Sequence, residues 1–341
     1  MQIKGKFVLE KTIADMVDFL YMQDDIIKID INSDLEHDYG SFSLSGLKID
    51  SKGFIYPAAM GFDLGCGVGV FKMYGCYNKK VKEIQYSSKS PFGIRRKKSI
   101  VEVCERENCL SQFQSVMNKS YYGEIETGNH FLEIQKNDNN EYFLVVHSGL
   151  PQKLKEQFEI FFVDFYREYV KEDSYKNNGY IVKMPYNSEN GKLFFDVCTL
   201  ANKWAETNRK YIAIEVGKKI GCSVECFVDT THEFLIRQQD VMIHSNGVQK
   251  LAGIDEQKVG IIISAKGCNN YLIRGKNDSM YINHGTKLRQ LLPDGKRIYG
   301  NVEELMKNSD FSKKIEVIDI LTPVLNCKKV GKKYEYTVLK K

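Results

Sequence analysis

Short apolar segments separated by glycines dominate the first 75 positions of the chain. They read KFVLE at residues 6–10, IIKIDI at 26–31 and GFIYPAAMGFDLGCGVGVFKMY at 53–74. Short apolar runs bounded by glycine are typical of strands and of the turns that join them. We therefore expect β-structure through this part of the chain.

Two longer segments repeat apolar residues at every third or fourth position, which is the spacing of an amphipathic helix. The first spans residues 155–171, and its stripe is aromatic: Phe158, Phe161, Phe162, Phe165 and Tyr169. The second spans residues 192–219, and we expect Gly221 to end it. Its stripe consists of Phe194, Val197, Cys198, Ala201, Trp204, Ala205, Asn208, Tyr211 and Ile212. We expect this second stripe to pack in a core rather than to hold a cofactor.

Strand-like segments return after the second helix. They read SVECFVDTTHEFLI, VMIHSNG, VGIIISA and NYLIRG. Helices and strands thus mix without a strict βαβ alternation, which predicts an α+β domain with a sheet core. The chain of 341 residues has no internal repeat and no low-complexity linker, so it forms one large domain or two modest ones.

Composition narrows the class of protein only a little. Hydrophobic residues make up 43% of the chain and charged residues 27%, which is typical of a globular protein. The net charge of +5 is compatible with a polyanionic partner without requiring one, and the RRKK run at 95–98 is more typical of a solvated surface. We expect no signal peptide and no membrane span, and nine scattered cysteines favour the reducing cytoplasm.

Several histidines stand at predicted ends of strands. His130 follows a Gly-Asn pair, His147 ends the run FLVVH before Ser-Gly, His232 lies in VDTTHEF, and His284 lies in YINHG. A single histidine at such a place is usually a polar residue with an ordinary hydrogen bond. Several of them at strand-to-loop junctions favour a site, because sites are built at such junctions.

The segment GFDLGCGVGV, residues 61–70, adds a carboxylate and a thiol. It is either a plain glycine turn with a small buried cysteine or a turn that directs Asp63 and Cys66 to one point. No GK[ST] follows it, which excludes a Walker phosphate loop. Asp63 and Cys66, with His130, His147 and His232, could hold two divalent metals bridged by the thiolate; ligand softness alone favours zinc or iron over manganese.

Five motifs in this sequence resemble, in order, those of the RtcB-type RNA ligases. They are GFDLGCGVGV, TGNHFLE, VVHSG, ANKWAETNR and NYLIRGK…NHG, and the resemblance runs from Asp34 to Lys328. Members of this family use GTP and manganese to join RNA 3′-phosphate or 2′,3′-cyclic phosphate ends to 5′-hydroxyl ends. The resemblance implies such RNA as the partner, in RNA repair or tRNA splicing, and it leaves the oligomeric state open.

The resemblance also implies a role for each matching residue of the expected metal site. Cys66 would bridge two manganese ions. Asp63 and His130 would complete the site of one ion, and His147 and His232 that of the other.

A second set of residues is implied for the nucleotide. His284 would be the nucleophile that takes GMP from GTP, and Asp34 would orient it. Asn129 and Glu133 would contact the nucleotide, and Lys328 would read guanine.

The fold that the resemblance implies is a single large α+β domain, residues 1–329. It would have layered sheets around a central metal-binding cleft, with flanking helices. Residues 330–341 would form a lysine-rich C-terminal extension.

The sequence departs from the family where an RNA phosphate is expected to bind. The family's H-S-G-S-R-G reads HSGLPQ here, without the arginine, and basic residues are also lost after His244 and after His284. Lys266, Lys287 or the 95–98 run could supply the charge. A relative that binds metal or nucleotide without sealing RNA, and a metal-dependent RNA end phosphoesterase, are therefore alternatives to a ligase. The ligase is favoured because His284 would serve no purpose in a protein that only binds.

Overall fold

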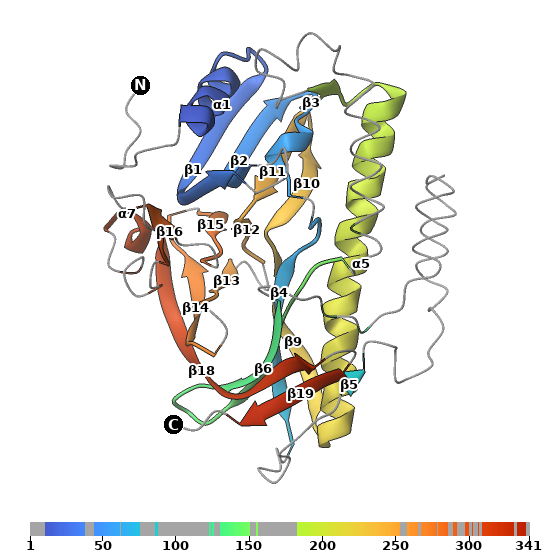
Figure 1. The fold of residues 1–341 in the computed structure, drawn as a ribbon, viewed down its shortest axis with the longest axis vertical. Coiled ribbons are helices and arrows are strands. Elements are labelled where there is room, and N and C mark those ends of the chain that lie inside the picture. Colours follow the sequence, from blue (N-terminus) through green and yellow to red (C-terminus); the bar gives the residue numbers. More distant parts are fainter. Residues whose placement is uncertain are drawn as a thin grey trace.

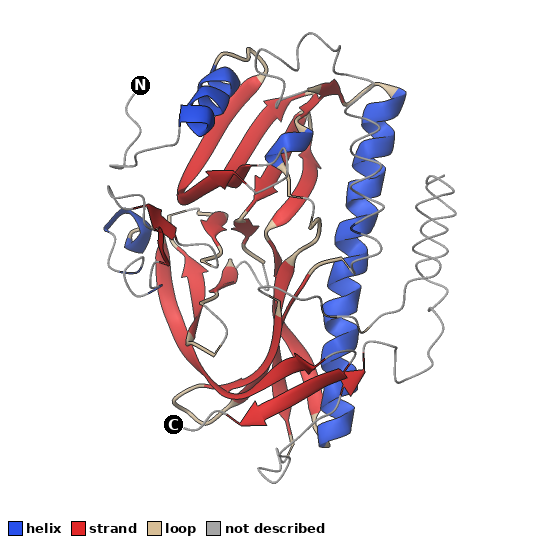
Figure 2. Ribbon diagram, in the orientation of Figure 1, coloured by secondary structure: helices blue, strands red, loops and turns tan. Residues whose placement is uncertain are grey.

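The computed structural model describes most of the chain apart from parts of its first half and several loops. The described residues are 11–37, 44–61, 63–75, 86–87, 123, 125, 130–150, 155, 183–252, 258–264, 267–277, 279–285, 289–291, 297–299, 302, 306, 309–330 and 333–338. Strands dominate them and mix with helices, which confirms the expected combination of α and β structure (Figure 2). The predicted aromatic helix at 155–171 lies outside the described residues except for Lys155.

One sheet carries a helix near the N-terminus, at residues 11–21, where β-structure was expected; that expectation was wrong. Its four strands are antiparallel, in the order β1 (Ile26–His37), β2 (Leu44–Lys52), β11 (Val241–Asn246) and β10 (Glu233–Gln238). Helix α1 (Lys11–Tyr21) buries Met16, Val17 and Leu20 against Leu47 and Ile49 of β2. Leu47 and Ile49 are two positions apart on β2, so they point to the same face of the sheet, and helix α1 covers that face.

A second antiparallel sheet bends until it is nearly closed. Its path is β13 (Val259–Ile262), β14 (Asn270–Gly275), β18 (Ile315–Val330), β6 (Phe131–Lys136), β7 (Tyr142–Ser148), β4 (Gly67–Tyr74) and β9 (Ser223–Thr231). The two end strands, β13 and β9, approach each other. One apolar cluster takes side chains from every strand of the path, among them Val68, Phe131, Val145, Val228, Ile261, Leu272 and Leu321. These side chains fill the inside of the curved sheet.

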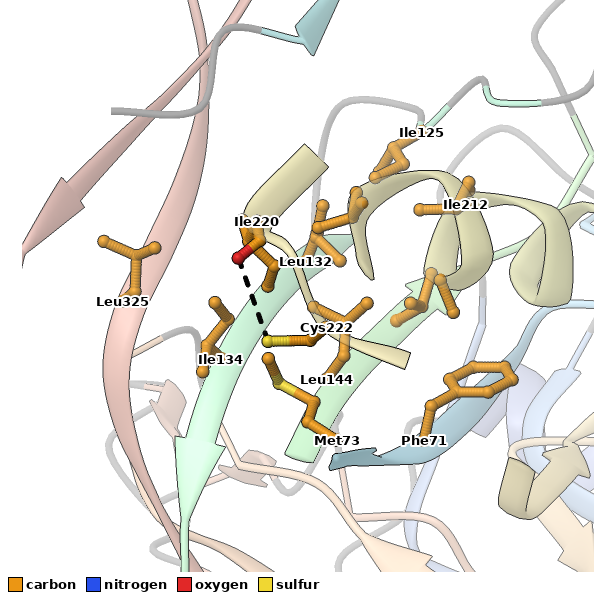
Figure 3. Close-up of a cluster of buried hydrophobic side chains, with 13 residues drawn as sticks. Phe71, Met73, Ile125, Leu132, Ile134, Leu144, Ile212, Ile220, Cys222 and Leu325 are labelled. Atoms are coloured by element: carbon orange, nitrogen blue, oxygen red, sulfur yellow. Dashed lines mark hydrogen bonds between the residues drawn. The ribbon is translucent and has the colours of Figure 1, made fainter. Parts of the chain in front are cut away.

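The long helix α5 (Glu189–Ile220) confirms the predicted helix at 192–219. The Ser188 hydroxyl caps its first turn by accepting from Gly191 N at 2.9 Å, and Gly221 ends it with a φ of 76°. The helix runs alongside both sheets (Figure 1). In its last turns Ile212 and Ile220 pack with Leu132, Leu144 and neighbouring side chains on the outer face of the curved sheet (Figure 3). The apolar stripe is therefore core packing, as expected.

The remaining elements are short. They are β3 (Phe54–Ile55), η1 (Pro57–Ala59), β5 (Tyr86–Ser87), β8 (Met184–Pro185), β12 (Val248–Lys250), β15 (Tyr281–Asn283), β16 (Arg289–Leu291), β17 (Arg297–Tyr299), α7 (Ser309–Ser312) and β19 (Lys333–Val338). The pairing of β12 with β15 brings Gly247 beside His284.

The C-terminal lysine-rich residues contribute to the curved sheet. Strand β19 pairs antiparallel with β18 and with β5. The division of the chain at residue 330 into a ligase domain and an extension stays a prediction. Among the described helices, none combines the length and the apolar character needed to cross a membrane.

Candidate active site

The turn after η1 brings Asp63 and Cys66 together in the interior. Cys66 N donates to Asp63 O at 2.7 Å, and Gly65 between them has a φ of +80°. A side chain at Gly65 would also collide with α5, because its Cβ would lie 2.7 Å from that of Ala205. Glycine is therefore required at position 65 for both conformation and space.

The carboxylate of Asp63 is held in a fitted recess. Leu150 N donates to its Oδ1 at 3.1 Å, and a Cβ at Gly149 would lie 2.1 Å from the same oxygen. The Gly149 of the motif VVHSG thus makes room for the Asp63 of the motif GFDLGCG. Lys155 Nζ lies 3.4 Å from Asp63 Oδ2.

Two histidines converge on the Cys66 thiol from neighbouring strands. His130 Nε2 is 3.2 Å and His147 Nε2 is 3.3 Å from Cys66 Sγ. His147 lies opposite Phe131 in the β6–β7 ladder and opposite Val68 in the β4–β7 ladder, so sheet register alone brings it beside both other ligand segments. His130 Nε2 is also 3.2 Å from Asp63 Oδ2.

His232 places a ring nitrogen within 4.8 Å of the same sulfur. Its backbone N donates to Cys66 O at 2.9 Å, and its ring lies 5.3 Å from that of His147. The ring is buried, and within the described part of the chain its Nδ1 has no hydrogen-bond partner. Burial, with the neighbouring histidines His284 and His147, lowers the pKa of His232 well below its usual range, which keeps the imidazole in the neutral form that binds metals.

These donors form two overlapping groups that share the thiol. Cys66, His130 and His147 make one group, and Cys66, His232 and Glu233 make the other; within each, the ligand atoms lie within 4.8 Å of one another. Burial raises the pKa of the Cys66 thiol, and the carboxylates of Asp63 and Glu233 raise it further. A cation placed here would stabilise the thiolate, so the donor set fits divalent metal ions.

Arg209 of α5 fixes the two segments that carry these ligands. Its Nη1 donates to Gly65 O at 2.7 Å and to Ser148 O at 3.0 Å, which are the neighbours of Cys66 and His147. The guanidinium is fully buried and pairs with Asp229 at 2.6 Å. Burial alone would lower the pKa of Arg209, but Asp229 and weaker contributions from Cys66 and Glu206 together raise it, so the group stays charged. Arg209 belongs to the matching motif ANKWAETNR, yet the sequence assigned it no role.

His284 lies at the end of β15 against this cluster. Its Nδ1 is 2.7 Å from Gly247 O, and because a carbonyl oxygen only accepts, Nδ1 carries the proton and Nε2 keeps its lone pair. The ring stacks on that of His232 with a centroid distance of 4.0 Å and an interplanar angle of 27°. Gly285, with a φ of +92°, ends the strand where a side chain would collide with Ile262.

Comparison with known proteins agrees with these motifs, although no family model matches the chain. RNA-splicing ligase RtcB1 of Escherichia coli strain ATCC 25922 is 21% identical over 282 residues, which cover 69% of this chain and 67% of that protein. RNA-splicing ligase RtcB of Escherichia coli strain K12 is 20% identical over 283 residues, with the same two shares of 69% and 67%. RtcB2 of strain ATCC 25922 is 24% identical over 254 residues, or 67% of this chain and 59% of that protein.

The chain is thus distantly similar to three RNA-splicing ligases of the RtcB type. The resemblance drawn from the motifs is thereby confirmed.

The structure describes fewer of the residues predicted to bind the nucleotide than of those predicted to bind the metals. Buried Glu133 accepts from Gly267 N at 2.8 Å and from Gln135 Nε2 at 2.7 Å, so it holds the turn that follows β13. Asn129 lies outside the described residues. Asp34 and Lys328 lie on β1 and β18, and their side chains are outside the described part. The nucleotide roles of all four residues stay predictions.

His244 is a structural residue of the first sheet. Its Nε2 accepts from Tyr56 N at 2.9 Å, and its Nδ1 lies 3.2 Å from Ile49 O. Both ring nitrogens of His244 therefore form hydrogen bonds with the backbone. Burial lowers the pKa of His244 to about 4, so the ring is neutral at physiological pH.

Two charged residues at the Cys66 cluster had no place in the sequence interpretation. Lys155 lies eight positions after His147, and only the fold brings it to Asp63. Glu233 directly follows His232, and that adjacency was the available signal. In a strand, neighbouring side chains point to opposite faces, so adjacency alone does not predict a shared site.

Proposed function

We propose that the protein is a GTP- and manganese-dependent RNA ligase. It would join RNA 3′-phosphate or 2′,3′-cyclic phosphate ends to 5′-hydroxyl ends through GMP bound to His284, in cytoplasmic RNA repair or tRNA splicing. The observation that carries the proposal is the stacking of His284 on His232, at the edge of the Cys66 cluster. The distant likeness to RNA-splicing ligases supports the same conclusion.

The residues that would hold two manganese ions in this proposal are Asp63, Cys66, His130, His147 and His232. All five are buried. Bound cations would neutralise the charge of the reacting phosphates. The role of Arg209 is to position Cys66 and His147, since it binds the carbonyl of the residue before the first and that of the residue after the second.

His284 supplies the covalent step. The Nδ1–H bond to Gly247 O keeps the ring in one tautomer and one orientation. Nε2 would attack the α-phosphorus of GTP, forming a nitrogen–phosphorus bond while the bond to pyrophosphate breaks and pyrophosphate leaves with the electron pair. GMP would then pass to the RNA 3′-phosphate, and the 5′-hydroxyl would displace it.

The nucleotide would lie over the same cluster, between segments that are far apart in sequence. Asn129 and Glu133 would contact it, Lys328 would read guanine, and Asp34 would act with Gly247 in orienting His284. A single domain of residues 1–329 with its sheets around a central cleft belongs to this proposal. Lys155 is a candidate for the positive charge that the missing family arginine would provide, because its ammonium already lies beside Asp63.

The two alternatives predict different products. A metal-dependent phosphoesterase would use the same ligands without needing His284, and a relative that only binds would use neither GTP nor RNA ends chemically. The family motif H-S-G-S-R-G reads HSGLPQ here and so lacks the arginine expected to bind an RNA phosphate. The test therefore includes both alternatives.

The test is to incubate the protein with α-labelled GTP and manganese. The proposal predicts an acid-labile label on the wild-type protein that is absent from His284→Ala. No label, with phosphate released from RNA ends, would support the phosphoesterase. No label and no turnover, with manganese retained, would support the relative that only binds.

A further inference from the structure

Glu233 occupies the junction between the two main sheets. Strand β9 of the curved sheet ends at Thr231, and β10 of the first sheet begins at Glu233, so only His232 separates them. Two backbone bonds clamp this junction to the Cys66 turn: His232 N donates to Cys66 O at 2.9 Å, and Gly65 N donates to Glu233 O at 2.8 Å. The main chain therefore fixes Glu233 beside the thiol.

The Glu233 carboxylate points into the cluster and has a space shaped for it. Its ligand oxygen lies within 4.8 Å of the ligand atoms of Cys66 and His232. A Cβ at Gly61 would come to 1.9 Å from Glu233 Oε2, so a residue larger than glycine at position 61 would displace the carboxylate. Asp63 N donates to the same oxygen at 3.1 Å, which sets the direction of the carboxylate.

The chemistry of this position favours a bound cation. A carboxylate beside a thiol opposes ionisation of the thiol, and the Glu233 carboxylate lies within 4.8 Å of Cys66 Sγ. A divalent ion between them would reverse that opposition, because both anionic groups would then be ligands. A ring nitrogen of His232, within 4.8 Å of both, offers the third donor.

We propose that Glu233 is a ligand of the second metal ion, together with Cys66 and His232. The inference rests on the metal pair of the proposed function and adds a residue that the family resemblance did not imply. A carboxylate oxygen is a harder donor than a thiolate or an imidazole. Glu233 thus shifts the second site toward manganese, whereas the Cys/His donors alone favour zinc or iron.

The first experiment compares the manganese content of Glu233→Gln with that of the wild-type protein after loading and desalting. Glutamine keeps an oxygen that can accept from Asp63 N but loses the charge, so it separates a ligand from a structural brace. We expect two ions in the wild type and about one in Glu233→Gln, or at least a roughly tenfold weaker second ion. Two ions bound with wild-type affinity in Glu233→Gln would overturn the assignment, as would a wild type that binds fewer than two.

A matched control is Glu215→Gln. Glu215 is also a buried glutamate, but it lies on α5 and pairs with Lys218 at 2.7 Å. This variant is expected to keep both ions. Loss of an ion from Glu215→Gln as well would show that the loss reflects a general weakening of the fold, and would overturn the assignment.

Thermal unfolding distinguishes a metal ligand from a structural brace even if Glu233→Gln is less stable than the wild type. For a ligand, the rise in melting temperature on adding manganese shrinks in the variant, while the metal-free variant melts close to the metal-free wild type. For a structural brace, the metal-free variant melts lower and the rise is unchanged. A wild type that binds two ions but takes up no GMP would refute the proposed function and leave the role of Glu233 standing.

Discussion

The imidazole rings of His284 and His232 stack at a centroid distance of 4.0 Å. One ring is the proposed nucleophile and the other a proposed metal ligand, so the covalent and the metal chemistry meet at one contact. Since Gly247 O fixes the proton of His284 on Nδ1, the lone pair is on Nε2. The geometry thus supports a single site in which the metals bind and the nucleotide reacts with His284.

The shared thiol predicts unequal effects of two substitutions. Cys66→Ala is expected to lose both manganese ions, because Cys66 belongs to both donor groups, whereas His232→Ala is expected to lose mainly one. Metal analysis of the two purified variants measures this directly. Equal loss of a single ion from both would contradict the shared thiolate.

The recess around Asp63 predicts that Gly149→Ala weakens manganese binding. The added methyl would lie 2.1 Å from Asp63 Oδ1 and would push the carboxylate away from His130. A manganese titration is expected to show at least a roughly tenfold loss of affinity. Gly53→Ala is the control: its Cβ would meet nothing within 4 Å, so strain at a φ of +72° costs about 1 kcal/mol of stability without changing metal affinity. Unchanged manganese affinity in Gly149→Ala would show that the recess does not position Asp63 for metal binding.

Arg209 predicts a large loss of stability. Arg209→Met leaves Asp229 without its partner and frees the carbonyls of Gly65 and Ser148. Breaking a buried ion pair by removing one partner costs roughly 3–5 kcal/mol. Urea unfolding of the metal-free protein measures the change, and Arg209→Met combined with Asp229→Leu is expected to recover part of it. A single variant with wild-type stability would contradict the positioning role.

His244 predicts a pH dependence of stability. The folded protein keeps this ring neutral down to about pH 4, whereas a histidine in the unfolded chain takes up a proton near pH 6.5. The unfolded state binds more protons in between, so this contribution is present above pH 6.5 and is lost as the pH falls toward 4.

The measurement is the free energy of unfolding of the metal-free protein at pH 7 and pH 5. The wild type is expected to lose about 2 kcal/mol more than His244→Gln over that interval. Buried His232 titrates in the same direction in both proteins, so the difference isolates His244. Identical losses in the two proteins would show that His244 does not carry the effect.

Local patterns predicted helix α5 and many of the strands, but not helix α1, which lies where β-structure was expected. The stripe at 192–219 predicted α5 because helical period and a terminal glycine are local signals. Cys66, His130, His147 and His232 were each recognisable beside glycine or at a strand end. Their convergence is fixed by sheet register and by the turn at Gly65, which the sequence does not encode locally.

What the sequence did not predict depends on contacts between distant segments. Arg209 has its role because helix α5 packs against both the Gly65 turn and the end of strand β7, and Lys155 meets Asp63 only in the folded chain. The sequence interpretation treated residues 330–341 only as a lysine-rich extension and predicted no strand there. The alternation of Tyr334, Tyr336 and Val338 was the local signal for β19.

The most direct test of the central claim is the mass of the intact protein after incubation with GTP and manganese. The account predicts an increase equal to one GMP, located by peptide mapping on the segment that carries His284 and absent from His284→Ala. An unchanged mass for a wild-type protein that has bound its two manganese ions, or a GMP attached elsewhere, would contradict it.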